Sequence, residues 1–383
     1  MKHTEQTFYR PQLDCLRFFA FVFVFISHAF SIDPDYYNQL GASPTLALWI
    51  SKTIGSGGLG VVLFFVLSSY LITELLVREL DRRGRLDVKS FYVRRALRIW
   101  PLYYFFLLLV YLAIPKDSIY SLQTNFFLSM VLFVGNWACV FTNGMGDSVA
   151  GPLWSISVEE QFYLAWPVII SQVGIRYLKH ICIGLIVIAN VTRIVMEKKG
   201  AGFIAFWCST VTWFDAIAAG ALIALLLRGR TPRLSFFVRL FLGLLGICVW
   251  VLTIRFRSLL IYPDVASFPL VIAASSMILV ATLSGNLSNP VLVYLGRMSY
   301  GLYVFHALGL AIASFFLTKY SALHALMGLA LTIMMAAASF HWLEKPFLKL
   351  KKRFTYVATD PIPLSERVTM AVSDERGFSD HPY

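Results

Sequence analysis

The chain is divided into long apolar segments, each about as long as a helix that crosses a membrane. A hydrocarbon core about 30 Å thick needs about 20 apolar residues in a helix. Only 14% of the 383 residues are charged, whereas soluble domains have about 25%. We therefore predict an all-α polytopic membrane protein. The segments lie near residues 13–31, 57–77, 99–115, 124–142, 153–172, 178–196, 207–228, 236–254, 266–284, 299–318 and 322–343.

Basic residues indicate which side of the membrane the loops face. One cluster follows the second apolar segment and another follows the last, and such clusters mark cytoplasmic loops. Both termini are therefore expected in the cytoplasm, which requires an even number of crossings. The first cluster comprises Arg78, Arg82, Arg83, Arg85, Lys89, Arg94, Arg95 and Arg98, and the second comprises Lys349, Lys351, Lys352 and Arg353.

The segment 124–142 is the one that we expect not to cross. It is interrupted by Gly135 and Asn136, and a re-entrant or interfacial path is allowed where protein or water covers the backbone. About ten transmembrane helices remain, in a domain predicted over residues 1–348. Residues 349–383 are polar, with mixed charges and no hydrophobic period, which predicts a cytoplasmic tail without ordered structure.

The net charge of +12 lies largely in short loops. It therefore indicates topology and an anionic ligand rather than binding to nucleic acid.

The five cysteines show no paired spacing, so neither a disulfide framework nor a metal site is predicted. The first apolar segment is long and lacks a small-residue cleavage site, so no cleavable signal peptide is expected.

Two ionisable residues share one stripe of the first apolar segment. Arg17 and His28 are eleven residues apart. On a helix this spacing is three full turns plus about 20°, with a rise of about 16 Å, so both side chains point the same way. Asp14, one turn from Arg17, can pair with it. Ionisable residues inside a span usually mark a pathway or a reaction. The alternative is a snorkelling arginine and a hydrogen-bonded packing histidine.

Three arginines meet at the start of the third segment. Arg94 and Arg98 share a helix face, Arg95 is adjacent, and Pro101 follows. Their forked donors suit the phosphates of a ligand. The alternative is that they only anchor the helix on the cytoplasmic side.

Two adjacent carboxylates lie in the segment 153–172. Ser155, Glu159 and Tyr163 recur at four-residue steps and therefore share one helix face, whereas Glu160 is turned about 100° away. A carboxylate there could orient a sugar hydroxyl or an imidazole. We take Glu159 as the more important of the pair, and Trp154 as a neighbouring candidate.

Other segments give weaker signals. Asp215 leads into a helix of small residues, and His306 lies in a later span. Residues of this kind are more often structural than functional, so their roles stay open.

Several sequence pieces, taken in order, resemble the membrane-bound acyltransferase-3 family, whose members O-acylate cell-surface carbohydrates and some natural products. One piece reads Trp-Ser-x-Ser-Val-Glu-Glu-Gln-Phe-Tyr, and another is an arginine followed by histidine at the eleventh position. Ser69 and Trp213 depart from the family pattern, which more often has Gly and Arg there. The matching pieces are Leu13–Arg17 with His28, Gly60–Ser68, Tyr92–Pro101, Leu153–Tyr163, Phe214–Ala216, Gly296–His306 and Leu343–Phe347.

The resemblance implies an enzyme that moves an acyl group, most often acetyl, from acyl-CoA to a carbohydrate hydroxyl. The acceptor would be a surface polysaccharide or a lipo-oligosaccharide, and the enzyme would lie in the bacterial inner membrane. No bound cofactor and no metal are implied. No SGNH-type domain follows the last span, so the stand-alone form is expected.

The resemblance also assigns roles to residues. His28 would be the catalytic base with Arg17 essential beside it, and Glu159 would line the site. Arg94, Arg95 and Arg98 would serve the donor. The remaining candidate substrate contacts are Asp14, Trp154, Ser155 and Tyr163.

A small-solute or proton-coupled transporter is the alternative function, because transporters also use buried Arg, His and Glu. The sequence shows no internal repeat of the kind that marks inverted-topology transporters. A transporter would move its substrate without changing it covalently, whereas an acyltransferase would transfer label from acyl-CoA.

Overall fold

A computed structural model describes residues 9–142, 144, 146–256 and 263–356. All regular structure in these ranges is helical, which confirms the predicted all-α polytopic class. The helices are α1 (Pro11–Ala29), α2 (Pro34–Gln39), α3 (Pro44–Gly55), α4 (Gly60–Arg83), α5 (Val88–Ala113), α6 (Thr124–Val131), α7 (Gly135–Thr142), α8 (Trp154–Val173), α9 (Ile175–Lys198), α10 (Phe203–Cys208), α11 (Phe214–Leu227), α12 (Phe236–Phe256), α13 (Pro263–Leu283), α14 (Pro290–Arg297), α15 (Ser299–Ser314), α16 (Ala322–Ser339) and α17 (Lys345–Lys351).

Each of the ten predicted crossings corresponds to a helix, but only eight helical stretches in the described residues are both long and apolar enough to span a membrane. The other two predicted crossings are α8 and α15. The helix α15 has only 16 residues, and most of its side chains are buried. A helix enclosed by its neighbours does not need a lipid-facing surface along its whole length. The number of crossings and the side of each terminus stay predictions.

The segment 124–142 forms two short helices, α6 and α7, rather than one long helix. Each has eight residues, too few to cross a bilayer. The break lies at Phe133, whose φ is +54°. Its carbonyl accepts a hydrogen bond of 2.8 Å from Gln161 of α8, and Tyr103 of α5 donates to the Met130 carbonyl at 2.9 Å. Protein therefore covers the backbone at this break.

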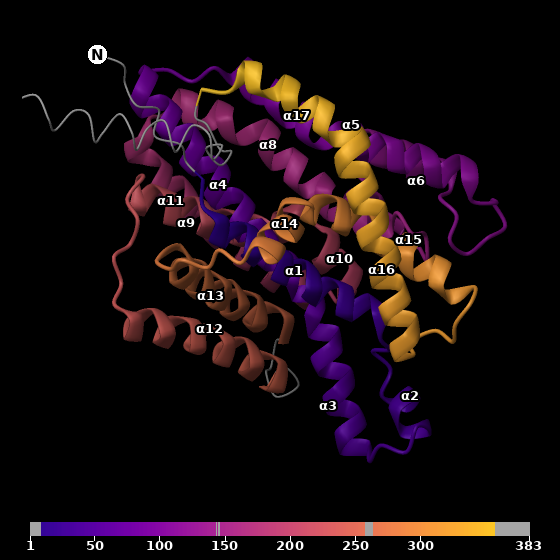
Figure 1. Cartoon of the computed structure of the whole chain (residues 1–383). Coiled ribbons are helices and arrows are strands. Elements are labelled where there is room, and N and C mark those ends of the chain that lie inside the picture. The colour runs from indigo at the N-terminus through magenta and orange to yellow at the C-terminus, as the bar shows by residue number, and fades with distance from the viewer. Residues whose placement is uncertain (1–8, 143, 145, 257–262, 357–383) are drawn as a thin grey trace, which may run out of the picture.

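The helix α1 runs through the middle of the bundle and packs against α4, α14 and α15 (Figure 1). Two glycines allow this close approach. A Cβ on Gly60 of α4 would overlap the Ala20 carbonyl, and one on Gly296 of α14 would overlap the Asp14 carbonyl. Small residues at helix contacts let backbones meet in membrane proteins. Phe21 and Val24, which lie between Arg17 and His28 on α1, are thus buried by neighbouring helices, whereas Arg17 is partly exposed and His28 is exposed.

Asp215, whose role the sequence left open, forms a buried ion pair between α9 and α11. Its two carboxylate oxygens each lie 2.6 Å from a guanidinium nitrogen of Arg193, and Arg193 also donates to the Thr212 carbonyl. Neither side chain is more than 3% exposed. The pair therefore joins two helices, and neither residue lines the cavity described below.

The last helical region continues past the predicted domain boundary at residue 348. After α16 the chain forms a π-helical turn (Phe340–Glu344), then α17 and a 3₁₀ turn that ends at Phe354. The first part of the predicted tail is therefore helical. The rest of the tail, residues 357–383, lies outside the described residues.

Candidate functional site

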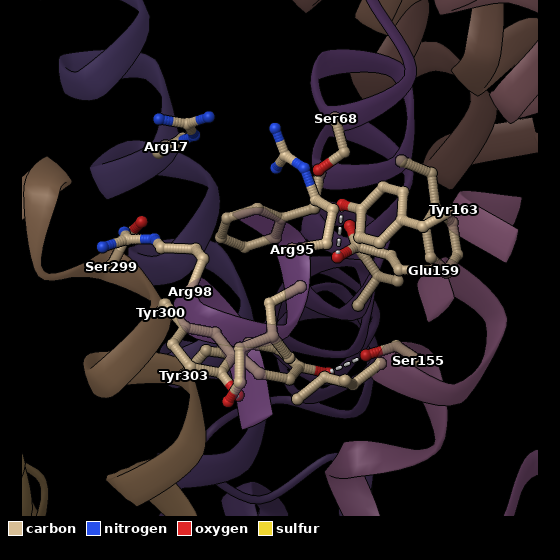
Figure 2. A pocket seen from close by; sticks show the side chains of 15 residues that line it. Arg17, Ser68, Arg95, Arg98, Ser155, Glu159, Tyr163, Ser299, Tyr300 and Tyr303 are labelled. Carbon is tan, nitrogen blue, oxygen red and sulfur yellow. Dashed lines mark hydrogen bonds between the residues drawn. The ribbon is translucent and has the colours of Figure 1, made fainter. Parts of the chain in front are cut away.

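A cavity of about 120 Å³ lies between α1, α4, α5, α8 and α15. Figure 2 shows the arginines at one end of this cavity and the hydrogen bond between Ser155 and Tyr303 at the other. Residues from five helices far apart in the sequence meet here. The lining comprises Arg17, Val61, Phe64, Phe65, Ser68, Arg95, Arg98, Ile99, Ser155, Ile156, Glu159, Tyr163, Ser299, Tyr300 and Tyr303.

Three guanidinium groups contribute positive charge to the cavity. Arg17 of α1 forms one ion pair, 3.0 Å from Asp14, and its side chain is still 32% exposed. Arg98 of α5 lies 3.8 Å from Glu344, at the limit of an ion pair. Arg95 packs its guanidinium 5.6 Å from the centre of the Tyr163 ring. These arginines therefore have N–H groups that can donate hydrogen bonds to an anionic ligand.

The carboxylate of Glu159 lies on the α8 wall, which Arg95 contacts through Tyr163. The Tyr163 hydroxyl donates to it at 3.1 Å, and Ser155, one turn before it, shares a 2.7 Å hydrogen bond with Tyr303. The helix periodicity of α8 brings all three of these α8 residues to one wall. Glu160 faces α5 instead, where Trp100 donates to it at 3.2 Å.

His28 lies further along α1, outside the cavity lining. Its Nδ1 donates to the Val24 carbonyl at 2.9 Å, which leaves Nε2 without a proton in the neutral ring. The residue is exposed, so Nε2 is available to a substrate. The ring lies 4.9 Å from that of His306 on α15, which in turn lies 5.4 Å from the ring of Tyr303 in the cavity wall.

Besides His28, three candidate residues lie outside the lining: Asp14, which pairs with Arg17, Arg94 and Trp154. Arg94 was grouped with Arg95 and Arg98, but it pairs with Glu79 at 2.9 Å and donates to the Phe354 carbonyl at 2.7 Å. It does not line the cavity, because its head group is turned toward α4 and the 3₁₀ turn that ends at Phe354. Trp154 is buried against Trp213, with ring centroids 5.9 Å apart, and supports the wall from behind.

Four polar residues of the lining were not among the sequence candidates. All four lie within stretches that carried the family resemblance, Ser68 in Gly60–Ser68 and Ser299, Tyr300 and Tyr303 in Gly296–His306. Tyr300 and Tyr303 differ by three positions, so they share a face of α15. That spacing was the available signal, but it does not show which helices the face meets.

A family model described as an acyltransferase domain matches residues 10–341. The chain therefore belongs to the acyltransferase-3 family, which confirms the resemblance drawn from its motifs. No solved structure matches it.

Three bacterial relatives have names that state an activity. A Staphylococcus aureus protein provisionally named an O-acetyltransferase is 28% identical over 372 residues, covering 89% of this chain and 58% of its own. The Listeria monocytogenes peptidoglycan O-acetyltransferase OatA is 28% identical over 347 residues, with coverages of 82% and 55%. Bacillus subtilis YrhL, provisionally named a peptidoglycan O-acetyltransferase, is 27% identical over 372 residues, with coverages of 90% and 55%. This chain thus spans little more than half the length of each relative.

Proposed function

We propose that this protein is a membrane O-acetyltransferase that moves an acetyl group from acyl-CoA to a carbohydrate hydroxyl. The observation that carries this proposal is the cavity lined by Arg17, Arg95, Arg98 and Glu159, together with an accessible His28 further along the helix of Arg17. The names of the relatives make peptidoglycan the first acceptor to test.

The donor would bind at the arginine end. Coenzyme A carries several phosphate charges, and guanidinium groups donate paired hydrogen bonds to phosphate oxygens. Arg17 and Arg98 are partly exposed, at 32% and 25% of their side chains. An anionic donor can therefore reach both guanidinium groups, because neither is held by two carboxylate contacts.

His28 would act as the general base. Its Nε2 takes the proton of the acceptor hydroxyl, and the hydroxyl oxygen attacks the thioester carbonyl. The carbon–sulfur bond then breaks, the ester forms, and coenzyme A leaves as a thiolate that takes up a proton. A positioned base of this kind contributes about 10²–10⁴ in rate.

The distance along α1 fits a donor that binds at one end and reacts at the other. Arg17 and His28 are separated by a rise of about 16 Å, and the thioester of acyl-CoA sits at the end of a long arm. The acetyl group would approach His28 past Tyr303 and His306, whose rings connect the cavity wall to His28.

The test is acetyl transfer by the full chain in liposomes. Acetyl-CoA labelled in the acetyl group is supplied with soluble peptidoglycan fragments, and base-labile label on the glycan is counted. We expect transfer by the wild type and a loss of about 10²–10⁴ in rate for His28→Ala, with unchanged membrane insertion. Rates equal to wild type in a well-inserted His28→Ala protein would overturn the mechanism. Uptake of solute without covalent change would favour a transporter.

A further inference from the structure

His306 is a buried histidine of α15 to which the proposed reaction assigns no chemical role. Its side chain is 0% exposed. Nδ1 lies 2.5 Å from the Tyr303 carbonyl of its own helix, so Nδ1 carries the proton and Nε2 is a bare acceptor. That Nε2 has no hydrogen-bond partner within the part of the chain that the structure describes. A buried acceptor without a hydrogen bond is destabilising, which calls for an explanation.

The ring of His306 is directed at α1. Because Nδ1 is turned back to its own helix, Nε2 lies on the side of the ring away from the Tyr303 carbonyl. The residues that the ring meets there are His28, at 4.9 Å between ring centroids, and Phe21, at 6.4 Å. Both contacts are edge-to-face, with interplanar angles of 75° and 82°.

His324 provides a comparison within the same bundle. It is also buried, at 1% exposed, and its Nδ1 has no partner among the described residues. Its Nε2, however, lies 3.0 Å from Ser314 Oγ and 3.1 Å from the Leu310 carbonyl. An unpaired nitrogen alone therefore does not mark a site. The contact with an accessible second imidazole is what distinguishes His306.

We infer that His306 is a positioning residue for His28. The bare Nε2 of His306 stabilises the positive charge that forms on the His28 ring when His28 takes a proton. The catalytic consequence rests on the proposed acetyl transfer. The bare nitrogen is the negative end of the neutral imidazole dipole, and in a low-dielectric interior such a dipole acts strongly on a nearby charge. Phe21 and Tyr303 hold the ring in place.

The kinetic test compares His306→Phe, His306→Gln and the matched control His324→Phe. Phenylalanine keeps the ring but removes the nitrogen, whereas glutamine restores an acceptor. Removing one directly contacting donor from an oxyanion hole costs about 10²–10³ in kcat. The His306 nitrogen acts across a ring contact instead, so we expect kcat of His306→Phe to fall about 10- to 100-fold. The KM for acetyl-CoA should not change. His306→Gln should recover part of the loss, and His324→Phe should match the wild type.

A second measurement does not depend on acetyl transfer. Diethyl pyrocarbonate forms a bond to an unprotonated imidazole nitrogen and expels ethyl carbonate, which places transient positive charge on the ring. We expect carbethoxylation of His28, followed by peptide mass spectrometry, to slow several-fold in His306→Phe but not in His324→Phe. The exposed His180 serves as the internal reference within each protein.

The two measurements separate the failure of each proposal. If the wild type transfers no acetyl group but His28 is labelled more slowly in His306→Phe, the proposed function fails and the histidine pair stands. If a well-inserted His306→Phe protein matches the wild type in both kcat and labelling, the role of His306 is overturned. A rise in KM at constant kcat would also overturn it.

Discussion

Two groups of arginines and carboxylates inside the helical bundle are built in opposite ways. Arg193 and Asp215 form a closed pair, with two contacts of 2.6 Å and no exposure of Arg193. A bidentate pair of this kind has excellent geometry, which a buried ion pair needs to offset the cost of leaving water. It has little capacity for a ligand, and we assign it a structural role.

The arginines of the cavity are paired incompletely. Arg17 has one contact of 3.0 Å with Asp14 and stays 32% exposed, and Arg98 lies 3.8 Å from Glu344 and stays 25% exposed. Their positive charge is accessible and only partly compensated, so a phosphate can add to it. A structural or a ligand-binding role for an intramembrane arginine therefore depends on how many of its N–H donors already have partners, and its presence in a span does not decide between the two roles.

Breaking the closed pair should have the largest effect on stability. Asp215→Ala leaves Arg193 buried and uncompensated, which costs about 3–5 kcal/mol. We expect a sharp drop in the thermal unfolding midpoint in detergent. The double variant Arg193→Met with Asp215→Leu should recover much of it, because an apolar pair of similar volume removes the buried charge. An Asp215→Ala protein as stable as the wild type would contradict the structural role.

The arginines that open to the cavity should affect the donor instead. Arg98→Ala removes charge-assisted hydrogen bonds worth about 1.5–3 kcal/mol, so the KM for acetyl-CoA should rise about 10- to 100-fold. The buried Glu344 also loses its cation, so the thermal unfolding midpoint is measured alongside. The matched control is Arg94→Ala, whose head group contacts Glu79 and Phe354 outside the cavity. Steady-state donor titrations with both variants check this. The reverse ranking of the two KM values would move the donor site to the face of Arg94.

The two adjacent carboxylates of α8 give a smaller contrast. Glu159→Gln should lower turnover about 10-fold, the equivalent of one hydrogen bond of about 1.4 kcal/mol, because Glu159 lines the cavity. Glu160→Gln should have a milder effect, since Glu160 faces Trp100. Acetyl transfer at saturating donor measures both. An inactive Glu160→Gln protein beside an active Glu159→Gln protein would reassign the carboxylate.

The smallest expected effect lies outside the site, at the N-cap of α5. The pKa of Asp87 is lowered to about 2, because the backbone N–H and hydroxyl of Ser90 donate to its carboxylate, as does the hydroxyl of Tyr356. This stabilisation is present above the ordinary pKa near 4 and is lost as the pH falls toward 2.

Asp87→Ala should therefore cost about 1 kcal/mol at neutral pH, with no change in the KM for acetyl-CoA. Unfolding midpoints at pH 7 and pH 3 measure the cost, and the difference from wild type should shrink at the lower pH. A difference that stays constant with pH would show that the carboxylate charge does not contribute.

The sequence by itself determined where the long apolar helices lie and which residues share a face of one helix, but not the short helices α2, α3 and α14. Apolar length predicted the helical segments, and the period of 3.6 residues placed Ser155, Glu159 and Tyr163 on one side of α8. The same local geometry put Arg17 and His28 on one stripe of α1. These features depend only on residues within a few helical turns of each other, so they can be predicted from the sequence.

Only the tertiary structure decided which of these faces meet. Arg95 and Arg98 line the cavity while Arg94 pairs with Glu79, although all three lie within two turns of α5. Asp215 found Arg193 on another helix, and His306 of α15 lies against His28 of α1. Such partners are set by how the helices pack, through close approaches such as that at Gly296. One helix's periodicity gives a direction for each side chain but does not specify the helix that it meets.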